Sequence, residues 1–123
     1  SWTERVQAEH FDVMSGVNIS NNGKFVWGFT PGDWASYHDI NIPSAGSYTV
    51  RFRVKNPNNS QGDQLQFEKA GGAPVYAVVD VPPTGDSYTT VSAQINLNAG
   101  VQNFALSVPA GGWQINWFEL ERN

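Results

Sequence analysis

Apolar and polar residues alternate with a period of two along most of this chain. In residues 48–55, tyrosine, valine and phenylalanine alternate with threonine, arginine and lysine. Successive side chains of a β-strand point to opposite faces, so this pattern predicts a strand with one buried face. The same alternation recurs in residues 64–68, 91–97 and 104–108. We therefore expect a chain built mainly from half-buried antiparallel strands.

Clusters of turn-forming residues separate the alternating runs. They lie at residues 31–33, 43–46, 56–62, 82–86, 98–100 and 109–112. Glycine, proline, asparagine and aspartate favour tight turns because of their backbone freedom or their local hydrogen bonds. No segment has the three- and four-residue apolar spacing of an amphipathic helix. Short, regularly spaced strands joined by such turns predict an all-β sandwich or barrel.

The two ends of the chain are expected to form neighbouring strands, around residues 5–9 and 115–121, because termini often lie together in compact domains. Strict alternation in the last strand puts Ile115 and Trp117 on one face and the apolar residues Phe118 and Leu120 on the other. A β-bulge would bring both pairs into the core. We expect that bulge near Asn116.

The length of 123 residues fits one domain, and we expect a single module over residues 1–123. There is no cysteine, which excludes a disulfide framework and a thiolate metal site. No apolar run approaches the roughly 20 residues that a membrane-spanning helix needs. Because the chain starts with Ser1, we expect a processed chain or an excised module.

The formal net charge of −4 argues against a nucleic-acid partner. Only Arg51, Arg53 and Lys55 form a basic cluster, and they alternate along one strand face. A protein that binds a phosphate backbone needs a larger basic surface than this.

No group of residues predicts a catalytic site. Glycoside hydrolysis needs two carboxylates that face each other, whereas Asp33, Asp63 and Asp86 lie in expected turns. His10 and His38 are the only histidines, and no nucleophile elbow or phosphate loop is present. We expect no enzymatic activity.

Three tryptophans beside glycines suggest a surface for a flat, polar ligand. Trp27, Trp34 and Trp113 fall in expected loops or strand ends. The apolar C–H face of a pyranose can lie on an indole ring, so a sugar fits this description. For any single tryptophan a place in the core is an equal alternative. The three together favour an exposed platform.

Oxygen ligands near the chain ends raise the possibility of a metal site. Gln7 and Glu9 are two residues apart, so on one strand they point the same way, and Asn116 lies on the expected partner strand. Such an oxygen set suits Ca²⁺, although polar residues on an exposed strand face can also be simply solvated.

The chain resembles the family 6 carbohydrate-binding modules over nearly its whole length. The similar segments are VQAE at 6–9, MSGV at 14–17, GDWASY at 32–37, residues 42–54, LNAGVQ at 97–102 and GGWQINWFEL at 111–120. The resemblance implies a β-sandwich jelly roll of two antiparallel sheets. It also implies a non-catalytic module attached to a secreted polysaccharide-degrading enzyme.

The same resemblance implies a structural Ca²⁺ near the joined termini. Its ligands would be the side chains of Gln7 and Glu9, the side chain and backbone of Asn116, and a backbone carbonyl near Lys24.

Two sugar sites are implied as well. In the site between the loops, Tyr88 stands where the family usually has tryptophan, and Gln114 takes the position of the amide. The family's usual tyrosine aligns near Gly28, so Trp27 or Phe29 must oppose Tyr88, and we favour Trp27. Trp113 is expected to wall the same cleft. For the second site, on a sheet face, the implied aromatic is Trp34, with the core as the alternative.

The resemblance, together with the composition, implies a monomeric extracellular module that binds a neutral polysaccharide and binds neither nucleic acid nor membrane. Family members bind several glycans, and a β-glucan such as laminarin is our first choice, with xylan or agarose as alternatives. The few charges expected at the cleft favour a neutral ligand. A glycan-active enzyme and a protein–protein adhesion domain are alternatives of other classes, because fold alone does not settle function.

Overall fold

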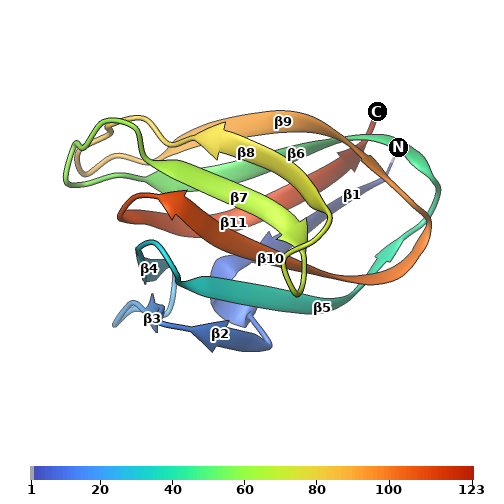
Figure 1. The fold of residues 1–123 in the computed structure, drawn as a ribbon, viewed down its shortest axis with the longest axis horizontal. Helices are drawn as coiled ribbons and strands as arrows, with labels where there is room; N and C mark the ends of the chain where they lie inside the picture. The colour runs from blue at the N-terminus through green and yellow to red at the C-terminus, as the bar shows by residue number, and fades with distance from the viewer. Residues whose placement is uncertain (1) are drawn as a thin grey trace.

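The computed structural model describes residues 2–123 as β-strands and one short turn of 3-10 helix, arranged in two antiparallel sheets. Figure 1 looks onto the five-stranded sheet, with most of the six-stranded sheet behind it. The all-β sandwich expected from the sequence is confirmed. No helix in this part of the chain is long and apolar enough to cross a membrane.

The six-stranded sheet has the order β3-β4-β11-β6-β9, with β1 also paired to β11. Its strands are β1 (Thr3–Gln7), β3 (Asn18–Ile19), β4 (Val26–Phe29), β6 (Gly46–Lys55), β9 (Thr89–Leu97) and β11 (Trp113–Arg122). Since β6 follows one edge of β11 along its length, β4 and β1 share the other edge. The two short strands therefore meet end to end along β11.

The five-stranded sheet has the order β2-β5-β10-β7-β8. Its strands are β2 (Val13–Ser15), β5 (Trp34–Ile42), β10 (Gly100–Ala110), β7 (Gln64–Lys69) and β8 (Val75–Asp80). In Figure 1 the two termini lie together at one end of the molecule. The connections β6–β7, β8–β9 and β10–β11 lie at the opposite end, beside β4. We call this opposite end the loop end.

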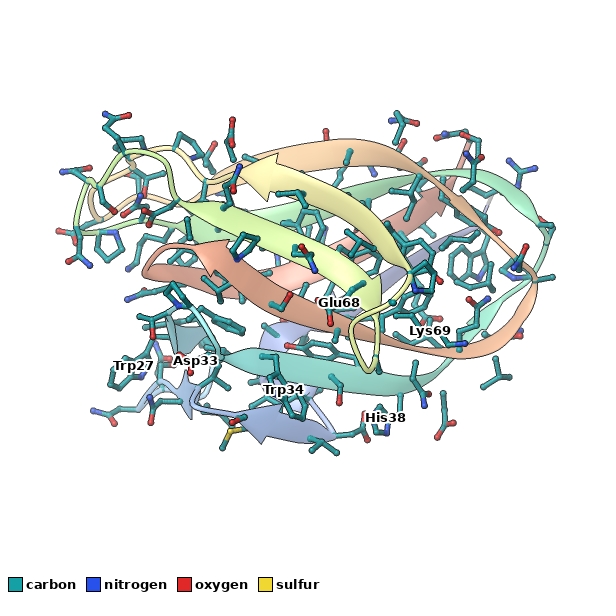
Figure 2. All side chains as sticks on the ribbon, in the orientation of Figure 1. Trp27, Asp33, Trp34, His38, Glu68 and Lys69 are labelled. Carbon is teal, nitrogen blue, oxygen red and sulfur yellow. The ribbon has the colours of Figure 1, made fainter. Side chains whose placement is uncertain are left out.

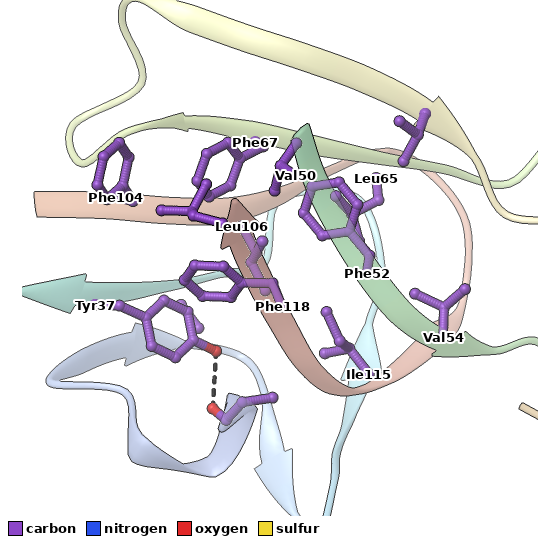
Figure 3. Close-up of a cluster of buried hydrophobic side chains, with 14 of the residues drawn as sticks. Tyr37, Val50, Phe52, Val54, Leu65, Phe67, Phe104, Leu106, Ile115 and Phe118 are labelled. Atoms are coloured by element: carbon purple, nitrogen blue, oxygen red, sulfur yellow. Dashed lines mark hydrogen bonds between the residues drawn. The ribbon is translucent and has the colours of Figure 1, made fainter. Parts of the chain in front are cut away.

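The core lies between the two sheets and follows the predicted alternation. Val50, Phe52 and Val54 of β6 are fully buried, as expected. Phe67 of β7 packs against aromatic rings from both sheets, with its centroid 5.7 Å from that of Phe52 (Figure 3). Burying one such side chain contributes about 1.5–3 kcal/mol relative to leaving it exposed, so this core holds the sheets together.

The expected pairing of the chain ends and the expected bulge are both confirmed. β1 runs antiparallel to β11, and the pairing of β11 with β6 shifts register between Ile115 and Trp117. Ile115 and Phe118 are consequently both buried. Trp117 differs from the expectation because it stays half-buried on the outer face, where the Arg5 guanidinium lies 3.8 Å from its ring centroid.

The first strand lies two residues earlier in the chain than predicted. It ends at Gln7, and Ala8–His10 form the 3-10 turn η1. Ala8 is fully buried and its carbonyl accepts a hydrogen bond of 2.8 Å from the Tyr37 hydroxyl, which anchors this turn against the core. Gln7 and Glu9 therefore do not share one strand face, and that expectation is wrong.

Candidate functional site

A groove of about 510 Å³ crosses the outer face of the five-stranded sheet. Strand pairing places Trp34 of β5, Ser107 of β10 and Gln66 of β7 side by side across its width. Small side chains on the central strand, Ala105 and Ser107, leave room for a ligand between the larger ones. We call this feature the sheet groove.

Trp34 lies in the sheet groove and outside the hydrophobic core. Its neighbour Ala35 is fully buried, so alternation along β5 turns Trp34 to the outer face, where it is half-buried. Figure 2 shows Trp34 and Glu68 on this sheet, with Trp27 at the loop end. The structure thus places Trp34 where the sheet-face interpretation put it, and the core alternative is wrong for this residue.

Glu68 supplies a carboxylate at the base of the sheet groove and is only 6% exposed. Its Oε1 accepts a hydrogen bond of 3.0 Å from Gln66 Nε2 and a second one from Ser107 Oγ. Gly72 lies beside Oε2, where an added Cβ would stand 3.7 Å away. Its φ of +106° also disfavours a side chain, so the turn after β7 leaves this carboxylate uncovered.

The sheet groove therefore combines one half-buried indole with carboxylate, amide and hydroxyl groups. Asp33 also lines it, but its Oδ2 accepts hydrogen bonds from the Thr30 amide and hydroxyl at 3.0 and 2.9 Å. Asp33 is thus engaged in the preceding turn. An apolar ring face beside a few fixed polar groups is typical of a small-molecule site.

Three of the predicted residues lie on the outer face of the six-stranded sheet at the loop end: Trp27, Gln114 and Tyr88. Gln114 pairs with Lys55, and Tyr88 precedes Thr89, which pairs with Val54. On the other side of Gln114, β4 carries Trp27, which is 44% exposed. The sheet thus carries four side chains in spatial order: Trp27 on β4, Gln114 on β11, Lys55 on β6 and Tyr88 just before β9. We call these four residues the loop-end row.

The two aromatic residues of the loop-end row flank its polar centre. Three strand spacings of about 4.8 Å separate the backbones of β4 and β9, or roughly 14 Å, so the rings must lean inward to hold one sugar. Phe29 is fully buried, which leaves Trp27 as the aromatic of β4 on the outer face. Burial raises the pKa of the Tyr88 hydroxyl, with nearby Arg53 acting in the opposite direction.

The loop-end row carries more positive charge than the sequence suggested. Lys55 Nζ lies 5.1 Å from the Tyr88 ring centroid and 5.3 Å from that of Phe25. The Arg53 guanidinium lies 5.9 Å from the Tyr88 centroid. Next to them, Gln114 Oε1 is buried without a hydrogen-bond partner. We expected few charges at the sugar sites. The sheet groove departs from this expectation because it contains Glu68. The loop-end row departs further because it contains Lys55 and lies beside Arg53.

Trp113 does not wall a cleft, and that prediction is wrong. Its side chain is fully buried, stacks on Phe29 at a centroid distance of 4.3 Å, and donates a 2.7 Å hydrogen bond from Nε1 to the Gln64 carbonyl. The physical reason is alternation along β11, which turns Trp113 and Ile115 inward and Gln114 outward. Trp113 is a core residue.

The predicted metal ligands converge where β1 and β4 meet along the edge of β11. Gln7, the last residue of β1, pairs with Trp117, and Val26, the first residue of β4, pairs with Ile115. Asn116 therefore lies between the ends of the two strands. Lys24 precedes β4 by two residues, which puts its backbone beside the same gap.

Glu9 is the one carboxylate among the predicted metal ligands. Its Oε1 is buried and has no hydrogen-bond partner. Burial raises the pKa of the Tyr37 hydroxyl, and the negative charge of Glu9 adds to this effect. The carboxylate of Glu9 is therefore close to that core tyrosine. An unpaired buried carboxylate oxygen is costly unless a cation or a donor meets it. The residues present therefore fit a hard cation held mainly by oxygen.

The contact between His38 and Ser36 does not have the arrangement that nucleophilic catalysis needs. His38 Nε2 lies 3.0 Å from Ser36 Oγ, but Ser36 is only 3% exposed and its hydroxyl also bonds to the Val13 carbonyl. Asp12 accepts a hydrogen bond from the His38 backbone amide, not from its ring. The pair has a structural role in joining β2 to β5.

Comparison with known proteins agrees with the fold. The family model for carbohydrate binding module family 6 matches residues 7–122. The structure resembles a module of Cellvibrio mixtus lichenase 5A in complex with cellotriose, with a TM-score of 0.88, 38% identity, and 98% and 97% of the two chains covered. It also resembles the C-terminal family 6 module of LamC, a marine laminarinase from Zobellia galactanivorans, with a TM-score of 0.88, 32% identity, and 98% and 99% covered.

A curated relative is similar to this chain over a small part of its own length. The clotting factor G alpha subunit of Tachypleus tridentatus is 31% identical over 129 residues. The match covers 99% of this chain but only 19% of that protein.

Proposed function

The chain belongs to carbohydrate-binding module family 6, and from this premise we propose that it binds a neutral β-glucan, with a β-1,3-glucan such as laminarin as first choice. The observation that carries the proposal is the sheet groove, where the half-buried Trp34 stands beside Glu68, Gln66 and Ser107. Family 6 modules are binding modules, so the chain acts by holding a glycan and not by cleaving it.

The chemistry of the sheet groove suits a glucan chain. The indole of Trp34 offers an apolar face to the C–H groups of a pyranose, and stacking of this kind contributes about 1 kcal/mol beyond area burial. The Glu68 carboxylate and the Gln66 amide offer hydrogen bonds to sugar hydroxyls. Bonds to a charged acceptor are the stronger ones, about 1.5–3 kcal/mol, so Glu68 is expected to fix the orientation of the sugar.

The similar structures favour a β-glucan over xylan or agarose. The neighbour at 38% identity holds cellotriose, and the neighbour at 32% identity belongs to a laminarinase. Both cover nearly the whole chain, which supports transferring the ligand class to this protein as a proposal.

A panel of soluble polysaccharides in affinity electrophoresis tests the proposal. Laminarin and barley β-glucan should retard the protein, xylan and agarose should do so less, and no reducing sugar should be released. Release of reducing sugar would favour a glycan-active enzyme. No retardation by any glycan would contradict the proposal and favour a protein–protein adhesion domain.

We also propose a structural Ca²⁺ at the junction of β1, β4 and β11. The side chains of Gln7 and Glu9, the side chain and backbone of Asn116, and the carbonyl of Lys24 would hold it. The buried, unpartnered Oε1 of Glu9 supports this assignment. The ion would join the two short strands that share one edge of β11 and would stabilise the sandwich without touching a sugar.

The setting of the module is a further part of the proposal. We propose that it forms one module over residues 1–123, acts outside the cell as a monomer, and directs an attached glycoside hydrolase to its polysaccharide. The match to only 19% of the clotting factor G alpha subunit supports attachment to a longer chain.

A further inference from the structure

The outer face of β6 carries three basic residues that differ in their partners. Arg51 is neutralised by two carboxylates, with Nη2 2.7 Å from Glu121 and Nη1 3.5 Å from Glu119. Among residues 2–123, the salt bridges involve only Arg5 and Arg51 as cations. Arg53 and Lys55, the next two residues along the same face, therefore have no carboxylate partner.

Of these two unpaired cations, Lys55 belongs to the loop-end row and Arg53 lies beside it on the same face of β6. Lys55 Nζ is close to the rings of Tyr88 and Phe25, at 5.1 and 5.3 Å from their centroids. Arg53 makes one hydrogen bond of 3.2 Å from Nη1 to Thr90 Oγ1, which leaves most of its donors unused. Both side chains are half-buried. Partly desolvated cations without a carboxylate are unexpected in a chain with eleven acidic and seven basic residues.

The sheet groove has the opposite character. Its lining includes the carboxylates of Glu68 and Asp33 but no lysine or arginine. An anionic sugar would be repelled there and attracted to Arg53 and Lys55. The screening length is about 8 Å at physiological ionic strength, so the net negative charge of the rest of the molecule acts weakly on a ligand in the loop-end row.

We propose that the loop-end row binds the anionic group of an acidic glycan, the carboxylate of a uronic acid or a sulfate ester. The sugar ring lies on the aromatic side chains, and Arg53 and Lys55 hold the anion. The planar guanidinium of Arg53 suits a two-pronged bond to either group, and Lys55 adds a point charge. The inference rests on the proposed function, because it gives one of the two glycan sites a ligand class of its own.

The test compares matched ligands by titration calorimetry in a Trp34→Ala background, which weakens the sheet groove. The ligands are cellotriose, cellotriose with its terminal C6 oxidised to a carboxylate, and 6-O-sulfated cellotriose. The anion would form two partly exposed ion pairs, one with Arg53 and one with Lys55. An anionic ligand should therefore bind about three- to tenfold more tightly than the neutral ligand at low salt. Raising NaCl to about 0.5 M should remove most of the preference.

Charge variants identify the groups responsible. Lys55→Met and Arg53→Met keep much of each apolar stem, and each should reduce the preference, with the double variant binding all ligands alike. Lys69→Met is the matched control, because it removes one exposed charge from the other sheet and should keep the preference.

The outcomes separate the two proposals. Equal binding of the neutral and anionic forms, or a preference that survives in the double variant, would overturn the acidic-glycan inference alone. A preference for only one anion would assign the site to a uronate or to a sulfate. Failure of the unmutated protein to bind any glucan would remove the proposed function and this inference with it.

Discussion

The orphaned carboxylate of Glu9 gives the sharpest stability prediction. If Ca²⁺ fills the junction of β1, β4 and β11, a free Ca²⁺ concentration of 100 times Kd stabilises the fold by about 2.7 kcal/mol. A domain of 123 residues has an unfolding entropy of roughly 0.26 kcal/mol/K. Saturating Ca²⁺ should therefore raise Tm by about 10 °C.

The Glu9→Gln variant should be less stable than the unmutated protein with Ca²⁺ but not with EDTA. With Ca²⁺, the unmutated protein keeps its one carboxylate ligand and melts higher than the variant. With EDTA, the unmutated protein buries a charged oxygen that has no partner, whereas the neutral amide avoids that charge. The metal-free variant should therefore melt at the same temperature as the metal-free parent, or above it.

Differential scanning calorimetry of both proteins, with EDTA and with excess Ca²⁺, measures all four states. Glu4→Gln is the control, since it removes a carboxylate from β1 outside the proposed ligand set and should keep the full Ca²⁺ response. Identical melting of metal-free and Ca²⁺-treated parent protein would refute the structural ion. A Glu9→Gln variant that still responds fully to Ca²⁺ would place the ion elsewhere.

Three further predictions concern the tryptophans and the charge of the ligand. Trp34→Ala should weaken laminarin binding at least five- to tenfold in titration calorimetry, because stacking contributes about 1 kcal/mol and the residue lies outside the core; unchanged affinity would remove the sheet groove as the main site. Trp113→Ala should lower the free energy of unfolding by about 3–5 kcal/mol in urea titrations, because a fully buried ring and its hydrogen bond are lost; a loss below about 1 kcal/mol would contradict its core role. Laminarin affinity should change little when NaCl is raised from 50 mM to 500 mM, which shortens the screening length from roughly 14 to 4 Å; a steep loss would contradict binding by stacking and hydrogen bonds to neutral hydroxyls.

The sheet framework was predictable because its signal is local. Alternation in residues 48–55 predicted the inward set of β6, and the four apolar residues at 115–120 required the bulge that the structure places at Asn116. Both inferences need only the period of two and the demand that apolar side chains be buried. Trp117 escaped the same rule because Arg5, distant in sequence, covers its ring on the outer face.

The functional surfaces were less predictable because they depend on register between distant strands. Trp34 was found from its own sequence context, but Glu68, Gln66 and Ser107 join it only through the pairing of β5, β10 and β7. A partial signal was present, since both Gln66 and Glu68 are polar members of an alternating run.

The error at Trp113 shows where local evidence misled. Its flanking glycines suggested an exposed strand end, yet its alternation with Ile115 already pointed inward. Likewise, the alternation of Arg53 with Lys55 was visible in the sequence, but their lack of carboxylate partners required the neighbouring strands. Pairing of charges across strands is a tertiary property that composition does not report.

The most direct test of glucan binding in the sheet groove is a two-dimensional ¹H–¹⁵N NMR titration that follows the indole N–H signals of the five tryptophans. Signals are assigned by substituting each tryptophan in turn. Addition of laminarihexaose should shift the Trp34 indole signal strongly and leave that of the buried Trp113 in place. Saturating sugar that leaves the Trp34 signal unmoved would contradict the account.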